Sequence, residues 1–183
     1  MQSRLPRVST ILRILDDAYE GVPQGVLATA AERGERLHRL CLTYLASLDG
    51  LCSPPSEIRA EDAAAFTTFV NWVEVNQVKP VAIEEQSICT AHQYSGTPDA
   101  LVLYGPNQVL TLPDLKFTAS ILRINRIQIQ AYHKLDLYKD AKQMMLVHIT
   151  PKDGHLKQET IKHDARDFAA FMNALSVWRW RQG

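Results

Sequence analysis

The hydrophobic periodicity of the chain changes at Pro80, and this change constrains the fold more than any other feature of the sequence. Before Pro80, apolar residues recur at the spacing of amphipathic helices. After it, they alternate with polar residues or form short continuous runs, as strands do, and helical segments return between later strands. This order predicts an α/β fold in which helices flank a central mixed β-sheet, with a helical N-terminal segment.

We expect helices and strands bounded by glycine- and proline-containing loops. The expected helices cover residues 8–19, 26–48, 59–75, 126–139 and 164–181. The expected strands cover residues 81–85, 100–104, 109–117, 143–150 and 157–161. The turn sequences Gly105-Pro106-Asn107 and Asp153-Gly154 each indicate a hairpin between the strands that flank them.

Composition excludes several classes of protein. The 183 residues contain 20 lysines and arginines against 20 aspartates and glutamates, which argues against coating DNA through bulk positive charge. The 3 cysteines form no C-x-x-C pair, so a zinc ribbon, a disulfide framework or a four-cysteine iron–sulfur site is not expected. No run approaches the roughly 20 apolar residues of a membrane helix. We therefore expect one domain in an intracellular, cytoplasmic protein without a membrane partner.

Asp99, Asp114 and Lys116 are the residues most suited to catalysis. Asp99 lies at the start of one expected strand and Asp114 near the end of the next, with 14 residues between them. That length accommodates a strand, a tight turn and a return strand, so the hairpin can place the two carboxylates side by side. Because residues i and i+2 of a strand point to the same face, Lys116 projects beside Asp114.

Two carboxylates and one ammonium group on one surface suit a hard cation such as Mg²⁺, which prefers oxygen ligands. A bound cation polarises a phosphoryl oxygen and lowers the pKa of a bound water, while a lysine can stabilise developing negative charge. Glu85, on the preceding expected strand, could add a third carboxylate. The alternative is an exposed ion pair of little energetic value. The surrounding strand is apolar, however, so a charged pair there is costly unless something neutralises it.

Three further features accompany these charged residues. His38 flanks the apolar stripe of the second expected helix and can point inward, either as a ligand or as a hydrogen-bonded core histidine. Gly96 precedes Asp99 and permits a tight backbone path before it. Gln128 and Tyr132 share one helix face, where they can brace a metal site, bind phosphate or form no more than a surface pair.

Together these residues resemble the motifs of the PD-(D/E)XK nuclease superfamily, in the RecB-like exonuclease branch often found in phages. The signature is present as Pro98-Asp99 followed, after 14 residues, by Asp114-Leu115-Lys116. The other elements of the branch occur in the family's order, and the match spans residues 8–135. They are Gly34 with His38, Glu85 or its neighbour Glu84, Gly96 to Asp99, and Gln128 to Tyr132.

The resemblance implies a restriction-endonuclease-like core in a single domain of residues 1–183. Residues 1–78 would be mainly helical, residues 80–117 would form a catalytic β-meander, and residues 126–183 would form a helix, a hairpin and the C-terminal helix. It also implies Mg²⁺- or Mn²⁺-dependent hydrolysis of DNA phosphodiester bonds. The expected enzyme is an exonuclease of phage-type DNA recombination or repair, acting in the host cytoplasm if it is encoded by a phage.

The resemblance also assigns roles to residues of this chain. It implies Lys116 as the catalytic lysine, Glu85 as a further acidic residue, and Gln128 and Tyr132 as groups that support the site and contact DNA. The implied metal ligands are His38, Asp99, Asp114 and the carbonyl of Leu115. The chain lacks the helicase that is fused to the large RecB enzymes, so unwinding or loading would need a homo-oligomer or a recombination or annealing partner.

The charge distribution is compatible with a DNA substrate. No acidic residue occurs from Leu115 to Leu135, and we expect Arg123 and Arg126 to contact DNA because they adjoin the expected site. For Trp178 and Trp180 near the C-terminus, packing of the terminal helix is favoured over base stacking. Three alternatives stay open: a non-catalytic DNA-binding module with the nuclease fold, a structure-specific endonuclease, and an unrelated interaction domain in which the two aspartates lie far apart.

Overall fold

The fold is that of a computed structural model, which describes residues 5–15 and 24–183. The helices are α1 (Val8–Leu12), α2 (Gln24–Leu48), α3 (Ala60–Val75), α4 (Arg123–Tyr132) and α5 (Ala165–Arg181). The strands are β1 (Lys79–Ile83), β2 (Ser87–Cys89), β3 (Tyr94–Gly96), β4 (Ala100–Tyr104), β5 (Val109–Lys116), β6 (Gln143–Ile149) and β7 (Leu156–Ile161). None of the helices in these described ranges is long and apolar enough to cross a membrane.

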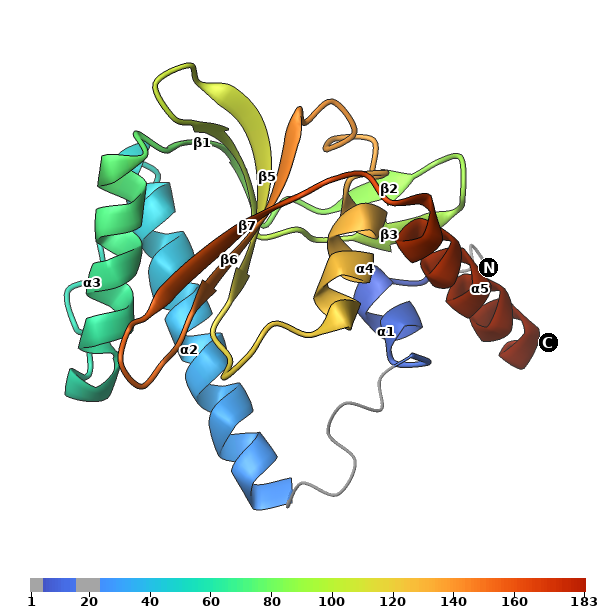
Figure 1. The fold of residues 1–183 in the computed structure, drawn as a ribbon, viewed down its shortest axis with the longest axis horizontal. Coiled ribbons are helices and arrows are strands. Elements are labelled where there is room, and N and C mark those ends of the chain that lie inside the picture. Colours follow the sequence, from blue (N-terminus) through green and yellow to red (C-terminus); the bar gives the residue numbers. More distant parts are fainter. Residues whose placement is uncertain (1–4, 16–23) are drawn as a thin grey trace.

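Five strands form a mixed sheet in the order β1-β4-β5-β6-β7. Neighbouring strands are antiparallel except β5 and β6, which run parallel and are joined by the crossover that contains α4. Helices α2 and α3 cover one face of the sheet, and α1, α4 and α5 lie on the other (Figure 1). The expected α/β architecture, a mixed sheet flanked by helices with a helical N-terminal segment, is therefore confirmed.

The alternation of β5 side chains between two cores decides where its charged residues point. Leu115 belongs to the core beneath α2 and α3, together with Val102 and Val147. Leu112 belongs to the core beneath α1, α4 and α5, together with Leu146. Because alternate residues share a face, Asp114 and Lys116 project on the same side as Leu112, toward α4.

Several predicted elements differ from the observed ones. The helix expected over residues 8–19 ends at Leu12, and residues 16–23 lie outside the described part of the chain. The strand expected over residues 81–85 ends at Ile83, because Glu84 adopts a left-handed backbone with a φ of 47°. Glu85 therefore follows the strand instead of lying on it.

The region from β1 to β5 is not an uninterrupted meander. A hairpin of β2 and β3, which the sequence did not indicate, is inserted between β1 and β4, and β1 pairs directly with β4. The helix expected over residues 126–139 is also shorter, because α4 ends at Tyr132 and a series of turns follows. Those turns place Leu135 and Tyr138 in the core, and the backbone N–H of Asp136 donates to the carbonyl of Ile88 in β2.

The expectation that both C-terminal tryptophans pack is half right. Trp178 is partly buried against the core, but Trp180 is 80% exposed because α5 extends beyond the sheet at that point. Of the three cysteines, Cys41 and Cys89 are buried thiols and Cys52 is exposed.

Candidate active site

The hairpin of β4 and β5 brings Asp99, Asp114 and Lys116 together. Lys116 Nζ lies 2.7 Å from Asp114 Oδ2. The backbone N–H of Leu115, between them in β5, donates to Asp99 Oδ2 at 2.6 Å. The Asp114 side chain is 1% exposed, so its charge is buried. The Lys116 side chain is 16% exposed, so it retains limited contact with solvent.

His38 reaches the same carboxylates from α2. Its Nε2 lies 2.9 Å from Asp99 Oδ1, and its ring makes an edge contact with Phe117. Gly34 makes this approach possible, because a Cβ at that position would lie 3.3 Å from the carbonyl oxygen of Phe117. The glycine that precedes the histidine by one helical turn thus lets α2 pack closely against the end of β5.

Gln128 and Tyr132 approach Lys116 from α4. The ammonium group of Lys116 donates to Gln128 Oε1 at 3.0 Å, and Gln128 Nε2 donates to the hydroxyl of Tyr132 at 3.2 Å. Gly96 admits this tyrosine, since a Cβ there would lie 2.9 Å from Tyr132 Cε1. Glycine is therefore needed at this position of β3 because Tyr132 packs closely against it. The sequence had suggested a different reason, a tight backbone path before Asp99.

The electrostatics of the site leave one carboxyl group poorly compensated. Burial, together with the charge of Asp99, raises the pKa of Asp114 to about 6 although Lys116 opposes the shift. Burial also acts to raise the pKa of Asp99, but the hydrogen bond and charge of His38 outweigh it and lower that pKa. Burial acts to lower the pKa of His38, and Asp99 more than reverses the effect. Within the described residues, Asp114 Oδ1 is buried without a hydrogen-bond partner, and Oδ2 faces the ammonium group of Lys116.

These residues fit a divalent cation by their chemistry. Two carboxylates, an imidazole and the nearby carbonyl of Leu115 form a mainly oxygen donor set of the kind that suits Mg²⁺ and Mn²⁺. The buried Asp114 carboxylate supplies negative charge, and Lys116 is the cation that lies against it. Within residues 5–15 and 24–183, no three histidine, cysteine, aspartate or glutamate side chains are already arranged around a metal position. Instead, the His38 imidazole pairs directly with the Asp99 carboxylate.

Glu85 does not join this group in the described structure. Its side chain is exposed, and its backbone carbonyl accepts a hydrogen bond from the hydroxyl of Tyr138 at 2.7 Å. The neighbouring Glu84 lies closer, because its N–H donates to the carbonyl of Asp99 and its charge acts on His38. Of the two adjacent glutamates, the geometry therefore favours Glu84.

Arg123 and Arg126, the residues expected to contact DNA, are engaged in ion pairs. Arg126 binds Glu159 of β7, and Arg123 lies 3.7 Å from Asp167 of α5. Both line a polar cavity of about 460 Å³ at the start of α4. Arg123 is 82% exposed, so its pairing leaves it accessible to solvent.

His148 is a neighbour of the site that the sequence analysis missed. It is paired with Lys116 across the parallel strands β5 and β6, and its Nε2–H donates to the carbonyl of Thr118 at 2.7 Å. It thereby holds the backbone that follows Lys116. A single histidine within the apolar run of β6 is the signal that could have identified it.

Comparisons with known proteins give structural neighbours only. No family profile matches the chain, and no characterised protein matches it at a significant level. The crystal structure of SSO0001 is 15% identical, with a TM-score of 0.48, over 100% of this chain and 79% of that one. An alkaline exonuclease (LHK-Exo) from Laribacter hongkongensis is 15% identical, with a TM-score of 0.49, over 96% and 86%. Its complex with dAMP is 14% identical, with a TM-score of 0.47, over 97% and 87%.

Proposed function

We propose that this chain is a divalent-metal-dependent nuclease that hydrolyses phosphodiester bonds of DNA. The observation that carries the proposal is the cluster of a buried carboxylate, Asp114, and a partly buried one, Asp99, with a lysine whose Nζ lies 2.7 Å from Asp114 Oδ2. Such a cluster is costly for a protein that has no use for a cation. It is the arrangement expected of a site that binds a metal ion and a phosphate.

In this proposal, Asp99, Asp114, His38 and the Leu115 carbonyl would hold Mg²⁺ or Mn²⁺. Such an ion, when bound, would polarise the phosphoryl group and make a bound water more acidic. Lys116 places its ammonium group beside the scissile phosphate, where it stabilises the charge that develops on the phosphoryl oxygens. Its hydrogen bond to Gln128 and its ion pair with Asp114 restrict the positions that the long side chain can adopt.

The remaining residues have supporting roles. Tyr132 fixes Gln128 from within α4, and His148 holds the backbone after Lys116. Arg123 and Arg126 would exchange their carboxylate partners for DNA phosphates, and Glu84 would add negative charge near His38. The motifs resemble the RecB-like branch of the PD-(D/E)XK nucleases, which supports an exonuclease of DNA recombination or repair within one domain of residues 1–183.

A cleavage assay tests the proposal. Linear duplex, single-stranded and closed circular DNA are incubated with the protein, with and without Mg²⁺ or Mn²⁺. We expect metal-dependent loss of linear DNA with circles spared, and end-labelling then gives the polarity. Cutting of circles would instead indicate an endonuclease.

Lys116→Ala is the decisive variant, and Lys139→Ala, at an exposed position in the turns after α4, is its matched control. We expect the first to abolish cleavage and the second to retain it, with both proteins folded. Full activity of Lys116→Ala, or no cleavage of any substrate by the folded wild-type protein, would refute the proposed function.

A further inference from the structure

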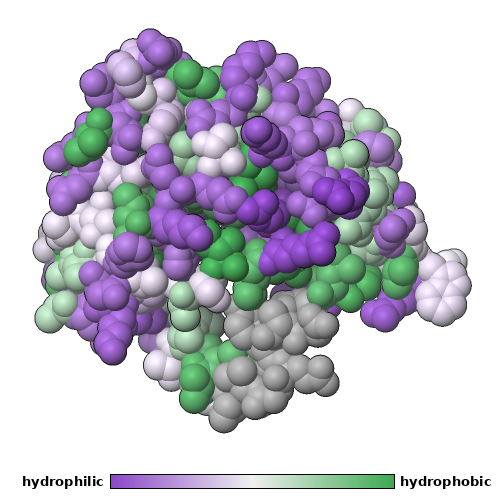
Figure 2. Space-filling view, in the orientation of Figure 1, coloured by the Kyte–Doolittle hydropathy of each residue, from purple (hydrophilic) through white to green (hydrophobic). Residues whose placement is uncertain are grey.

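A small cavity lined by basic side chains, the basic cavity, lies where β6 begins and β7 ends. Its volume is about 280 Å³. The antiparallel register pairs Met144 of β6 with Ile161 of β7, and the cavity walls continue on both chains just beyond that pair. Hydrophilic side chains cover much of the surface over the end of β7 and the start of α5 (Figure 2). The titratable residues that line the cavity are His133, Lys142, Lys162 and His163.

The basic cavity is separate from the candidate active site. Strands β5 and β6 run parallel, and their register places Lys116 beside His148. Gln143, which lines the cavity, lies at the other end of β6. At roughly 3.3 Å per residue, about 16 Å of strand separates Gln143 from His148. A ligand in the basic cavity would therefore not occupy the proposed metal and phosphate site.

The two lysines of the basic cavity have no acidic partner. Lys142 and Lys162 are exposed, and within residues 5–15 and 24–183 neither side chain takes part in an ion pair or a hydrogen bond. No aspartate or glutamate of the described chain lines the cavity. Like charges held around one cavity repel each other unless an anion enters, so the site favours a negatively charged ligand.

His133 adds a further group that an anion would affect. Its Nε2–H donates to the carbonyl of Ala141 at 3.0 Å, and its Nδ1 is buried without a hydrogen-bond partner among the described residues. Burial lowers the pKa of His133, and the charges of Lys134 and His163 act in the same direction. Asp140 opposes them more weakly and does not line the cavity. A bound anion would oppose these effects and favour the protonated imidazole.

A neutral hydroxyl group provides another donor. Gln143 Nε2 donates to Thr160 Oγ1 at 3.0 Å, so the Thr160 oxygen acts as the acceptor in that bond. The hydroxyl hydrogen of Thr160 is left for a ligand, because within the described residues it donates to no other group. Ammonium groups, an imidazole and a hydroxyl are the donors that an oxyanion such as phosphate requires.

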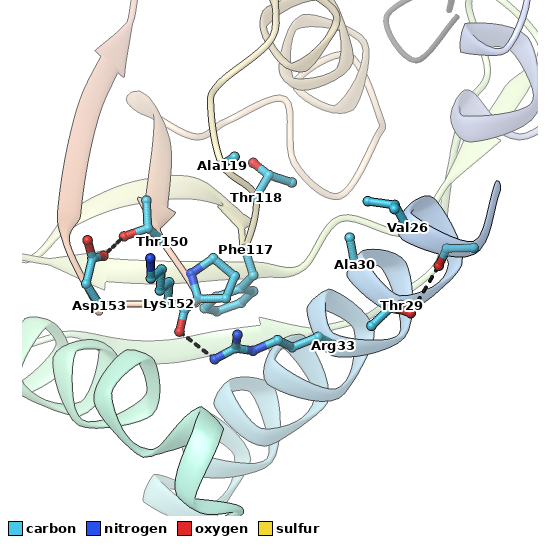
Figure 3. Close-up of a pocket in the computed structure, with 12 residues that line it drawn as sticks. Val26, Thr29, Ala30, Arg33, Phe117, Thr118, Ala119, Thr150, Lys152 and Asp153 are labelled. Carbon is cyan, nitrogen blue, oxygen red and sulfur yellow. Dashed lines mark hydrogen bonds between the residues drawn. The ribbon is translucent and has the colours of Figure 1, made fainter. Parts of the chain in front are cut away.

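Other cavities of the chain balance their charges. The cavity of about 460 Å³ at the start of α4 is lined by three cations and three carboxylates, which are Arg123, Arg126, Lys157, Glu159, Asp164 and Asp167. At the opposite end of the β6–β7 hairpin, Arg33 donates to the carbonyl of Pro151 and Lys152 lies next to Asp153 (Figure 3). Since the whole chain has 20 lysines and arginines and 20 aspartates and glutamates, the unbalanced charge of the basic cavity is a local feature.

We propose that the basic cavity binds a single phosphate group, either inorganic phosphate or the phosphate of a mononucleotide, between Lys142 and Lys162 with Thr160 as a hydrogen-bond donor. A cavity of about 280 Å³ suits one such group. A DNA strand instead presents successive phosphates and is bound along an extended groove. The inference goes beyond the proposed nuclease function and does not rest on it, because it assigns the chain a second ligand site.

Isothermal titration calorimetry in metal-free buffer at constant ionic strength tests the proposal. Inorganic phosphate and dAMP are titrated separately, so equal affinities identify the phosphate group alone as the ligand and tighter binding of dAMP identifies a nucleotide. We expect the double substitution Lys142→Ala and Lys162→Ala to weaken binding of phosphate at least about tenfold, because two charged hydrogen-bond donors are lost.

The matched control is Lys152→Ala, which removes an exposed lysine from the other end of the same hairpin. It should leave phosphate binding unchanged. The ring C–H resonances of His133 and His163 give a local readout by NMR. They should shift when phosphate is added to the wild-type protein and to Lys116→Ala, and should not shift in the double variant.

Three outcomes would overturn the proposal. The first is an absence of phosphate binding to the folded wild-type protein. The second is equal weakening by the double variant and Lys152→Ala, which would indicate adventitious binding to surface charge. The third is binding that Lys116→Ala abolishes and the double variant retains, which would place the phosphate at the candidate active site.

The result is independent of the cleavage assay. Wild-type protein that cleaves DNA but shows one of these three outcomes supports the nuclease and refutes the phosphate site. Protein that cleaves nothing, yet loses phosphate binding only in the double variant, supports the phosphate site and refutes the nuclease.

Discussion

Helix α2 supplies side chains to two buried carboxylate clusters that differ in how their charge is balanced. Toward α3, Asp62 is fully buried and faces two guanidinium groups. Arg36 Nε lies 2.6 Å and Arg33 Nε 3.4 Å from its oxygens. Burial acts to raise the pKa of Asp62, but the hydrogen bonds and charges of the two arginines outweigh it and lower that pKa.

The second cluster, Asp99 and Asp114 with His38 and Lys116, has two carboxylates for one ammonium group and one imidazole. Here burial prevails and the pKa of Asp114 rises to about 6. The difference shows that one helix can contribute both to an ion pair that stabilises the fold and to a cluster in which one carboxyl group is poorly compensated. Removal of a carboxylate should therefore have opposite effects on stability in the two places.

The largest expected effect is on catalysis. Asp114→Asn should lower metal-dependent cleavage by at least about 10³-fold, because it removes a proposed metal ligand and the partner of Lys116. At pH 7 the metal-free variant should be more stable than the wild-type protein, since asparagine resembles the protonated carboxyl group. Cleavage kinetics and urea unfolding measure the two effects, and a destabilised variant would contradict the comparison.

Asp62→Asn should have the opposite effects, with lower stability and unchanged cleavage. It leaves two arginines without their buried partner, and we expect the free energy of unfolding to fall by about 2–3 kcal/mol, less than for a fully buried pair because the Arg36 side chain stays 20% exposed. The melting temperature should fall by about 4–12 °C, with cleavage retained below it. Glu32→Gln, at an exposed carboxylate 3.8 Å from Arg36, is the control and should have a much smaller effect.

The pH dependence of stability should separate the two clusters further. The pKa of Asp114 is raised in the folded state, so the folded protein binds a proton that the unfolded chain loses, and stability in EDTA should fall by roughly 2 kcal/mol as the pH rises from about 4 to about 6. The raised pKa of His38 adds a loss in the same direction at higher pH.

The lowered pKa of Asp62 acts oppositely, since its contribution is present above the unfolded-state pKa of about 3.9 and is lost as the pH falls below that value. Urea titrations of the wild-type protein and Asp114→Asn in EDTA distinguish the two carboxyl groups. A fall in stability between about pH 4 and 6 that is equal in both proteins would show that Asp114 is not its source.

The smallest predicted effect concerns the support of Lys116. Tyr132→Phe removes the hydroxyl that accepts from Gln128 but leaves the Gln128–Lys116 bond, so cleavage should fall only a few-fold and stability by about 1 kcal/mol or less. Tyr94→Phe is the matched control, because the buried Tyr94 hydroxyl donates to the carbonyl of Ala131, away from Lys116. We expect it to lower stability without a change in cleavage. Equal cleavage by the two variants would refute the supporting role of Tyr132.

The long elements were predicted well because their signals are local. Helices α2 and α3 and strands β4 to β7 begin and end within two residues of their expected positions, since periodicity and turn residues determine them. Strands β2 and β3 have three residues each, too few for a periodic pattern. Helix α4 ends early because the following turns dock on β2 and place Leu135 in the core.

In the candidate site too, local sequence predicted some placements, and others depended on tertiary packing. Two adjacent strands and a tight turn bring Asp99 to β5, so local geometry sufficed to predict that it lies near Asp114 and Lys116. The placement of His38 and Gln128 depends on how two helices dock. Helix periodicity indicated which helix faces they occupy, and the motif resemblance suggested that they belong to one site. No sequence signal distinguished Glu84 from Glu85, because the left-handed backbone at Glu84 forms where the chain leaves the sheet.

The sequence by itself determined the class of fold and predicted that Asp99, Asp114 and Lys116 lie together, because hydrophobic periodicity and strand alternation act over short distances along the chain. Only the tertiary structure decided that Arg123 and Arg126 are paired with carboxylates, and that α2 supplies side chains to two carboxylate clusters whose charge is balanced differently. Burial and the charges that surround a group depend on segments far apart in sequence, and these set the pKa of Asp114.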